Sequence, residues 1–176
     1  MKIIVVRHGQ TKLNSKHLIN GWIDDVLTKD GLRQAKEASK KIPKGIDIIY
    51  SSDLKRALDT AKILNKKLDL KIVPSVNLRE INFGSLEGKF FSNDLIIPHR
   101  SMKYNWHPYG GESFGDVKKR LLKFLKKIRK DNKKVLIVTH GGIIRLLYHL
   151  QNKKSLHFIE NVSFHKFDLD KILNKV

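Results

Sequence analysis

Residues 1–11 read MKIIVVRHGQT, an apolar run that stops at an arginine, a histidine and a glycine. The run from Ile3 to Val6 is typical of a buried strand, and Gly9 lets the chain turn tightly where that strand stops. Arg7 and His8 therefore lie at the carboxyl end of a predicted strand. Open α/β sheets bind their ligands at this end.

A second histidine occurs in the same context. The apolar run Val135–Thr139 predicts another buried strand, and His140, Gly141 and Gly142 follow it directly. Two strand-end His-Gly units indicate a pair of histidines, His8 and His140, that face one pocket.

Strand and helix patterns alternate along the chain. We expect strands at residues 3–7, 46–50, 71–73, 135–139 and, at an edge, 162–168, and helices at about 28–42, 54–64, 114–130 and 143–150. In the first helix Leu32, Ala35 and Ala38 would face inward, and Ser51-Ser52-Asp53 would cap the second. Strands separated by helices of this length predict an α/β fold with a mostly parallel sheet.

The 176 residues are expected to form one domain, residues 1–176. Residues 86–113 lack clear periodicity, and a segment of this length without a pattern is often functional. We interpret it as a lid-like insertion over the ligand-binding end of the sheet; the alternative is an irregular packed excursion. Candidate contacts to a ligand in and beside it are Phe90, His99, Arg100, Tyr104 and Trp106. Lys89 and Arg79 could add charge near the pocket mouth, although a surface lysine is the favoured interpretation there.

The formal net charge is +19, from 36 Lys and Arg against 17 Asp and Glu. Residues 118–134 hold ten of these basic side chains, yet Val117, Leu121, Leu125 and Ile128 repeat at helical spacing. The region is therefore an amphipathic helix with a basic outer face. We favour a solvated face over a nucleic-acid site, because aromatic residues are not interleaved as a stacking platform requires.

Targeting and redox signals are few. No apolar run reaches the length of about 18 residues typical of a membrane span, and residues 3–6 are too short for a signal peptide, so we expect a cytoplasmic protein without a membrane partner. The chain has no cysteine, which excludes disulfides, thiolate nucleophiles and cysteine zinc sites. HxxxH does not occur and no clustered metal ligands stand out in the sequence, so no metal site is expected.

Arginine suits planar recognition of phosphate or carboxylate. Arg7 occupies the end of the first strand, and Arg56 lies near the N-terminus of the second predicted helix, which also favours an anion. For Arg56 the alternative is a surface ion pair with Asp53 or Asp59.

The two histidines can divide the chemistry. A neutral imidazole at His8, with its Nδ1 proton held by a backbone carbonyl, offers Nε2 as a nucleophile. A protonated imidazole at His140 would stabilise charge on a transferring group.

A carboxyl group is needed to protonate a leaving oxygen, and Glu80 follows the third predicted strand. Glu87 is a second candidate, although a solvated surface carboxylate is the favoured interpretation there. Gln10 and Asn14 in the first loop could donate hydrogen bonds to phosphate oxygens.

Five ordered blocks resemble the histidine phosphatase superfamily, the clan of cofactor-dependent phosphoglycerate mutases and related phosphatases. They are RHGQT (7–11), SSDLKRALDTA (51–61), LREINFGSLEG (78–88), GGES (110–113) and VTHGG (138–142), and the likeness runs from Lys2 to about Leu150.

The resemblance implies a three-layer α/β/α sandwich with a mixed, mainly parallel sheet and helices on both faces. It also implies a phosphohistidine at His8, with Arg7, Arg56 and His140 forming the phosphate pocket and Glu80 acting as proton donor and then base. Asn14 and the Gly141 backbone look like supporting phosphate contacts.

Both phosphatases and mutases of this family pass through the same phosphoenzyme. Members resembling glycolytic mutases are longer between the glutamate block and the second histidine, whereas here 22 residues separate Gly88 from Gly111. We therefore favour a metal-independent phosphatase for small anionic phosphomonoesters, needing no cofactor. The alternatives are a mutase primed by 2,3-bisphosphoglycerate and a non-catalytic polyanion-binding protein.

Overall fold

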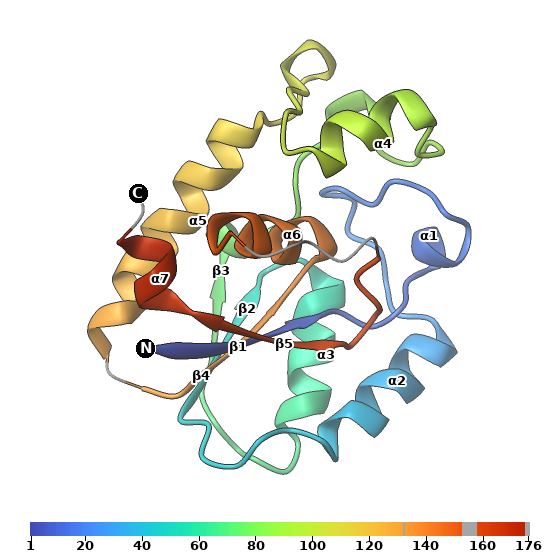
Figure 1. The fold of residues 1–176 in the computed structure, drawn as a ribbon. Helices are drawn as coiled ribbons and strands as arrows, with labels where there is room; N and C mark the ends of the chain where they lie inside the picture. The colour runs from blue at the N-terminus through green and yellow to red at the C-terminus, as the bar shows by residue number, and fades with distance from the viewer. Residues whose placement is uncertain (132, 153–157, 175–176) are drawn as a thin grey trace.

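Within residues 1–131, 133–152 and 158–174, which the computed structural model describes, five strands form one sheet in the order β3–β2–β4–β1–β5 (Figure 1). The strands are β1 (Lys2–Arg7), β2 (Ile48–Ser52), β3 (Ile72–Ser75), β4 (Val135–Thr139) and β5 (Phe164–Asp168). Four of them run parallel, and β5 pairs antiparallel with β1 at the edge. The adjacent parallel strands β1 and β4 align Arg7 with Thr139, which brings the residues that follow them together.

Helices cover both faces of this sheet (Figure 1). Because strand side chains alternate between the faces, Val6 and Val138 pack with the helices α2 (Lys29–Ser39) and α3 (Lys55–Asn65), whereas Val5 and Ile137 point to the opposite side. That side is covered by α5 (Phe114–Ile128), α6 (Gly141–Leu150) and α7 (Leu169–Leu173). The three-layer α/β/α architecture and the mixed, mostly parallel sheet are confirmed.

The expected helix beginnings differ in detail. Strand β2 starts two residues later than expected and includes Ser51 and Ser52, which are fully buried. Leu54 therefore caps α3, without a side-chain hydrogen bond. In α2 the expected inward residue Leu32 is 41% exposed. Gly31 takes the inner position because the backbone of Gln10 lies against it, and a Cβ there would come within 2.1 Å of the Gln10 carbonyl oxygen.

The segment expected to be a lid contains short helices and a packed aromatic cluster. Helix α4 (Asn93–Arg100) and the 3-10 turn η3 (His107–Tyr109) lie in it, after the 3-10 turns η1 (Val76–Leu78) and η2 (Gly84–Leu86). The rings of His99 and Trp106 contact Phe83, and Tyr104 contacts both of them, stacking on Trp106. The sequence of this segment lacks periodicity because aromatic rings from different turns pack together, whereas a periodic pattern requires one apolar helix face.

Besides α4 and the 3-10 turns, two short helices have no counterpart in the sequence prediction. Helix α1 (Lys12–Ser15) is a single turn after β1, capped by Thr11, and α7 is a single turn after β5, capped by Asp168. In the described part of the chain, no helix is both long and apolar enough to cross a membrane.

Candidate active site

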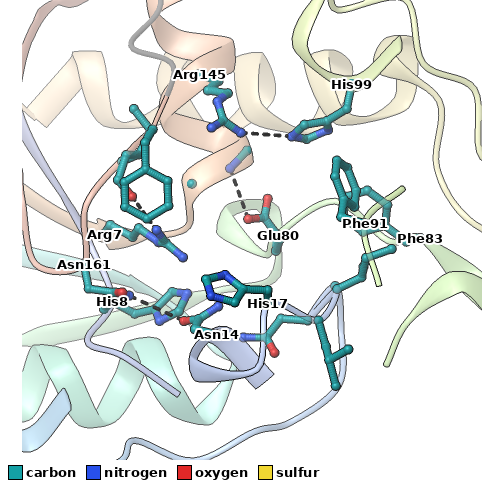
Figure 2. Close-up of a pocket in the computed structure, with 18 of the residues that line it drawn as sticks. Arg7, His8, Asn14, His17, Glu80, Phe83, Phe91, His99, Arg145 and Asn161 are labelled. Carbon is teal, nitrogen blue, oxygen red and sulfur yellow. Dashed lines mark hydrogen bonds between the residues drawn. The ribbon is translucent and has the colours of Figure 1, made fainter. Parts of the chain in front are cut away.

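A cavity of about 570 Å³ opens at the carboxyl ends of β1 and β4 (Figure 2). The sequence-predicted residues that line it are Arg7, His8, Gln10, Asn14, Arg56, Glu80 and Gly141. His140 lies behind this lining, fully buried, with its ring centre 5.1 Å from that of His8. The packing therefore brings all eight candidates to one place.

The His8 ring is oriented by its own backbone. Its Nδ1 lies 2.7 Å from the carbonyl oxygen of Gly9, and because a carbonyl only accepts, Nδ1 carries the proton and Nε2 keeps its lone pair. Burial lowers the pKa of His8 well below its ordinary value, and the charges of Arg56 and Arg7 lower it further. The arrangement presents a neutral imidazole whose Nε2 is available as a nucleophile.

Arg56 is a fully buried cation held by backbone carbonyls. Its Nη1 donates to Ile23 (2.8 Å) and its Nη2 to Gly21 (2.7 Å), and its Nε finds no acceptor in the described residues. The surface-pair alternative is wrong. Asp53 instead bonds Arg79, and Asp59 bonds Lys55.

Arg7 is held in a similar way. Its Nη1 donates to the carbonyl of Ile159, while its Nε, like that of Arg56, has no acceptor among the residues described. Burial lowers the pKa of Arg7 to about 10, against the opposing effect of Glu80. The guanidinium stays charged at neutral pH, so the site presents two cations with free donors to an anion, Arg7 partly buried and Arg56 fully buried.

The surroundings of His140 govern the charge of its ring. Neither ring nitrogen has a hydrogen-bond partner in the described part of the chain. Burial, followed by the charge of Arg56, lowers the pKa of His140 far below its ordinary value. The lowered pKa favours the neutral ring in the ligand-free protein, whereas the prediction of a protonated His140 concerns the site with a phosphate bound. An entering anion would offset the neighbouring cations and favour the protonated form.

Glu80 faces the cavity from an irregular segment after η1 (Figure 2). Its Oε2 accepts from the backbone N–H of Gly142 (3.0 Å) and its Oε1 from that of Ile81 (2.9 Å). Glu87 has a different position. Its Oε1 accepts from the backbone N–H groups of Trp22 and Phe83, so it joins two loops and is neither in the cavity wall nor a free surface carboxylate.

Gln10 and Asn14 line the cavity with their oxygens already engaged. Thr28 donates to the Gln10 Oε1 (2.9 Å), and the Asn14 Oδ1 accepts from the Thr11 backbone and from Asn161, both at 3.4 Å. The amide N–H groups are the donors that each side chain offers to a ligand.

Of the residues expected to meet a leaving group, His99 and Arg100 line the cavity. Tyr104 and Trp106 are buried in the aromatic cluster, and Phe90 is 72% exposed. Lys89 and Arg79 are absent from the wall that is described. Burial, with the charges of Arg145 and Arg100, lowers the pKa of His99 to about 3.

Sequence reasoning missed several residues of the site, and three of them carry polar or charged side chains close to the candidates. Asn161 donates from Nδ2 to the His8 carbonyl at 2.9 Å, and Arg145 and His17 line the cavity. Arg145 could have been found, because it lies four residues after Gly141 and so on the same helix face. No local signal pointed to Asn161 or His17.

The cavity wall is strongly cationic. Four arginines, Arg7, Arg56, Arg100 and Arg145, line it with one carboxylate, Glu80, among the described residues. Such a wall favours an anionic ligand. No group of three His, Asp or Glu side chains placed to share a metal ion occurs in the ranges that the structure covers.

Known proteins are similar to this chain in sequence and in fold. A family model described as "Histidine phosphatase superfamily (branch 1)" matches residues 3–172. The "Putative phosphoserine phosphatase 2" of Hydrogenobacter thermophilus is 32% identical, covering 92% of this chain and 83% of that protein. A "2,3-bisphosphoglycerate-dependent phosphoglycerate mutase" of Parvibaculum lavamentivorans is 35% identical over 82% of this chain and 77% of its own.

Among solved structures, a mycobacterial glucosyl-3-phosphoglycerate phosphatase in complex with VO3 superposes with a TM-score of 0.82 at 26% identity, covering 94% of this chain and 91% of that one. With the match of the family model over nearly the whole chain, the chain belongs to the histidine phosphatase superfamily.

Proposed function

We propose that this protein is a phosphatase that hydrolyses small phosphomonoesters through a phosphohistidine at His8. One observation carries the proposal: a neutral imidazole with a free Nε2 lies in a cavity with two arginines, the partly buried Arg7 and the fully buried Arg56. The relatives whose names contain phosphatase, and the VO3 complex of one of them, support it.

In the first step the His8 Nε2 attacks the phosphorus of the ester. An N–P bond forms, and the bond from phosphorus to the ester oxygen breaks. The free Nε donors of Arg7 and Arg56 hold the phosphoryl oxygens, where their charge stabilises the transferring group. Glu80 gives its carboxyl proton to the departing oxygen, so an alcohol leaves.

In the second step water is the acceptor. The Glu80 carboxylate takes a proton from a water molecule whose oxygen attacks phosphorus, and the N–P bond breaks. Inorganic phosphate leaves, and His8 and Glu80 return to their starting forms. No step draws on a metal or cofactor, and we propose that the enzyme works in the cytoplasm.

A second candidate is phosphoglycerate mutase activity, primed by 2,3-bisphosphoglycerate. Arg100 and Arg145 form a second cationic area in the cavity, which suits a substrate with a carboxylate beside its phosphate. The mutase relative supports this candidate. A mutase must keep water from the phosphohistidine, whereas the phosphatase requires its entry.

The nucleophile is tested with p-nitrophenyl phosphate in excess EDTA. Wild type should turn over, and His8→Ala should lose activity by at least about a thousandfold, because the covalent route is removed. His107→Ala, at an exposed ring outside the cavity, is the matched control and should keep full activity. A fully active His8→Ala, or a wild type that loses its activity to EDTA, would contradict the proposal.

The acceptor is tested with 3-phosphoglycerate. A phosphatase releases inorganic phosphate from it or from other esters in a panel of phosphoserine, sugar phosphates and nucleotides. A mutase forms 2-phosphoglycerate, faster when 2,3-bisphosphoglycerate is added, with little free phosphate. Dominant isomerisation would replace the first candidate by the second.

A further inference from the structure

The Glu80 side chain is attached to a stretch of backbone that has no strand or helix partners. Residues 79–83 lie between the 3-10 turns η1 and η2 without regular structure. Backbone carbonyls in such a stretch need hydrogen bonds from elsewhere. The position of the carboxyl group over the cavity therefore depends on whatever holds these carbonyls.

Arg120, on α5, bonds two of these carbonyls and one shortly before them. Its Nη1 donates to the carbonyls of Asn77 (3.0 Å) and Arg79 (2.8 Å), and its Nη2 donates to the carbonyl of Glu80 itself (2.9 Å). The two remaining N–H groups, on Nε and Nη2, donate to the carboxylate of Glu112 at 2.8 and 2.9 Å. All five N–H groups of the guanidinium are thus used.

Glu112 completes the attachment on the far side of Glu80. Its Oε2 also accepts from the backbone N–H of Asn82 (2.9 Å), and its own backbone N–H donates to the Asn82 carbonyl (2.8 Å). Both side chains of the pair are largely buried, at 14% and 16% exposed. The ion pair therefore forms hydrogen bonds with the backbone on both sides of Glu80.

Two further side chains hydrogen-bond the backbone that carries Glu80. Thr139, next to His140, donates to the Leu78 carbonyl at 2.7 Å, and the Trp22 Nε1 donates to the Glu80 carbonyl at 2.7 Å. Because Gly142 also donates to the Glu80 carboxylate, these contacts attach Glu80 and its backbone to the end of β4, beside His140.

We infer that Arg120 and Glu112 are positioning residues for the proton transfer by Glu80. Neither lines the cavity, so they act through Glu80 and not on the substrate. The inference rests on the proposed function, in which Glu80 protonates the leaving oxygen. A small displacement of an acid from its proton acceptor is enough to slow such a step strongly.

The test compares leaving groups. A poor leaving group, as in an alkyl phosphate, needs the Glu80 proton, whereas 2,4-dinitrophenolate leaves without one. The measured quantity is the ratio of kcat/KM for 2,4-dinitrophenyl phosphate to kcat/KM for an alkyl phosphate. This ratio does not depend on the fraction of folded enzyme, so a variant that folds poorly still gives an answer. Because kcat/KM reports on the steps up to the breaking of the ester bond, the ratio is not affected by hydrolysis of the phosphoenzyme.

Arg120→Lys keeps the charge but offers three donors on one atom, which cannot reach the carbonyls and the carboxylate together. We expect the ratio to rise by roughly tenfold or more, in the same direction as in Glu80→Gln, where loss of a general acid costs about 10²–10⁴-fold. Glu112→Gln should give a smaller rise. Arg129→Lys, near the end of the same helix and paired with Asp170 on the surface, is the matched control and should leave the ratio unchanged.

In a Glu80→Gln background, Arg120→Lys should not change the ratio further, because the group it positions is gone. If Arg120→Lys slows both esters equally while Glu80→Gln changes the ratio, Arg120 is merely structural and the inference is wrong. If Glu80→Gln leaves the ratio unchanged, the acid assignment in the proposed function fails, and the inference fails with it.

Discussion

One residue of the site, Arg56, buries a positive charge at a cost in stability. Arg56 is fully buried and donates to two backbone carbonyls, not to a carboxylate. Burial lowers its pKa, while the charge of Glu80 raises it in opposition. A buried cation without a close anionic partner costs stability. A phosphate group would supply that partner. Arg56 therefore lowers the stability of the free protein but favours the state with phosphate bound.

Arg56→Lys tests this residue. An ammonium group cannot reproduce the fork that reaches Ile23 and Gly21, so the free energy of unfolding should fall by about 1–3 kcal/mol in urea denaturation. With the phosphate donor also displaced, kcat/KM should fall by about 10²–10³-fold, and vanadate should no longer raise the melting temperature. Lys62→Ala, exposed on the same helix, should change none of these. Wild-type vanadate binding by Arg56→Lys would contradict the assignment.

At the scale of elements, the junction of β4 and α6 positions His140 and the Glu80 carboxylate. His140 is the residue that caps α6, and the first two helical residues are glycines. The backbone N–H of Gly142 donates to Glu80, and the N-terminus of this helix favours negative charge. The absence of a side chain at Gly142 lets the carboxylate approach, because a Cβ there would come within 2.4 Å of the Glu80 Oε1.

Gly142→Ala should therefore push Glu80 away. We expect kcat/KM for an alkyl phosphate to fall by about tenfold to a hundredfold, measured at pH 7. Gly115→Ala is the control: it lies in α5, and its Cβ would meet only the Ser113 Oγ, at 3.6 Å. It should stabilise the protein by up to about 1 kcal/mol through helix propensity without changing activity. Equal activity in Gly142→Ala would show that the close approach is not needed.

At the scale of the whole molecule, the protein is basic but keeps several histidines neutral inside. Burial is the first cause of the lowered pKa of His8, His140, His99 and His165. Near the cavity, Arg7, Arg56, Arg100 and Arg145 oppose protonation further. These rings bind protons more readily in the unfolded chain, whose histidines titrate near pH 6.5.

Stability should therefore fall as the pH drops below about 6.5, since the unfolded state then binds more protons than the folded state. Each such histidine contributes up to about 1.4 kcal/mol per pH unit, and for His99 the loss continues toward its folded pKa of about 3. Urea denaturation between pH 7.5 and 5.5 measures this slope.

His99→Gln should flatten the slope by about one histidine's share. A free energy of unfolding that stays constant from pH 7.5 to 5.5 would contradict the burial of neutral rings.

Local pattern was enough for much of the fold. The strand Val135–Thr139 was predicted with the bounds observed, and α5 within two residues, because apolar periodicity reports directly on which side faces the core. Prediction was poorer where contacts between distant segments override local preference. Leu32 lost its inner position to Gly31, and the serines of β2 were mistaken for a helix cap, because backbone packing decides both.

By itself, the sequence determined where the reactive groups stand along the chain: Arg7 and His8 at one strand end, His140 at another, and Glu80 in a loop between. Local pattern carries this information because each residue's place relative to its own strand depends on neighbours a few positions away. Only the tertiary structure decided that Asn161 bonds the His8 carbonyl across 153 positions, that Arg120 holds the Glu80 backbone, and that His140 is neutral without a ligand. Burial and the distances between charges belong to the packed chain as a whole, so no short stretch of sequence encodes them.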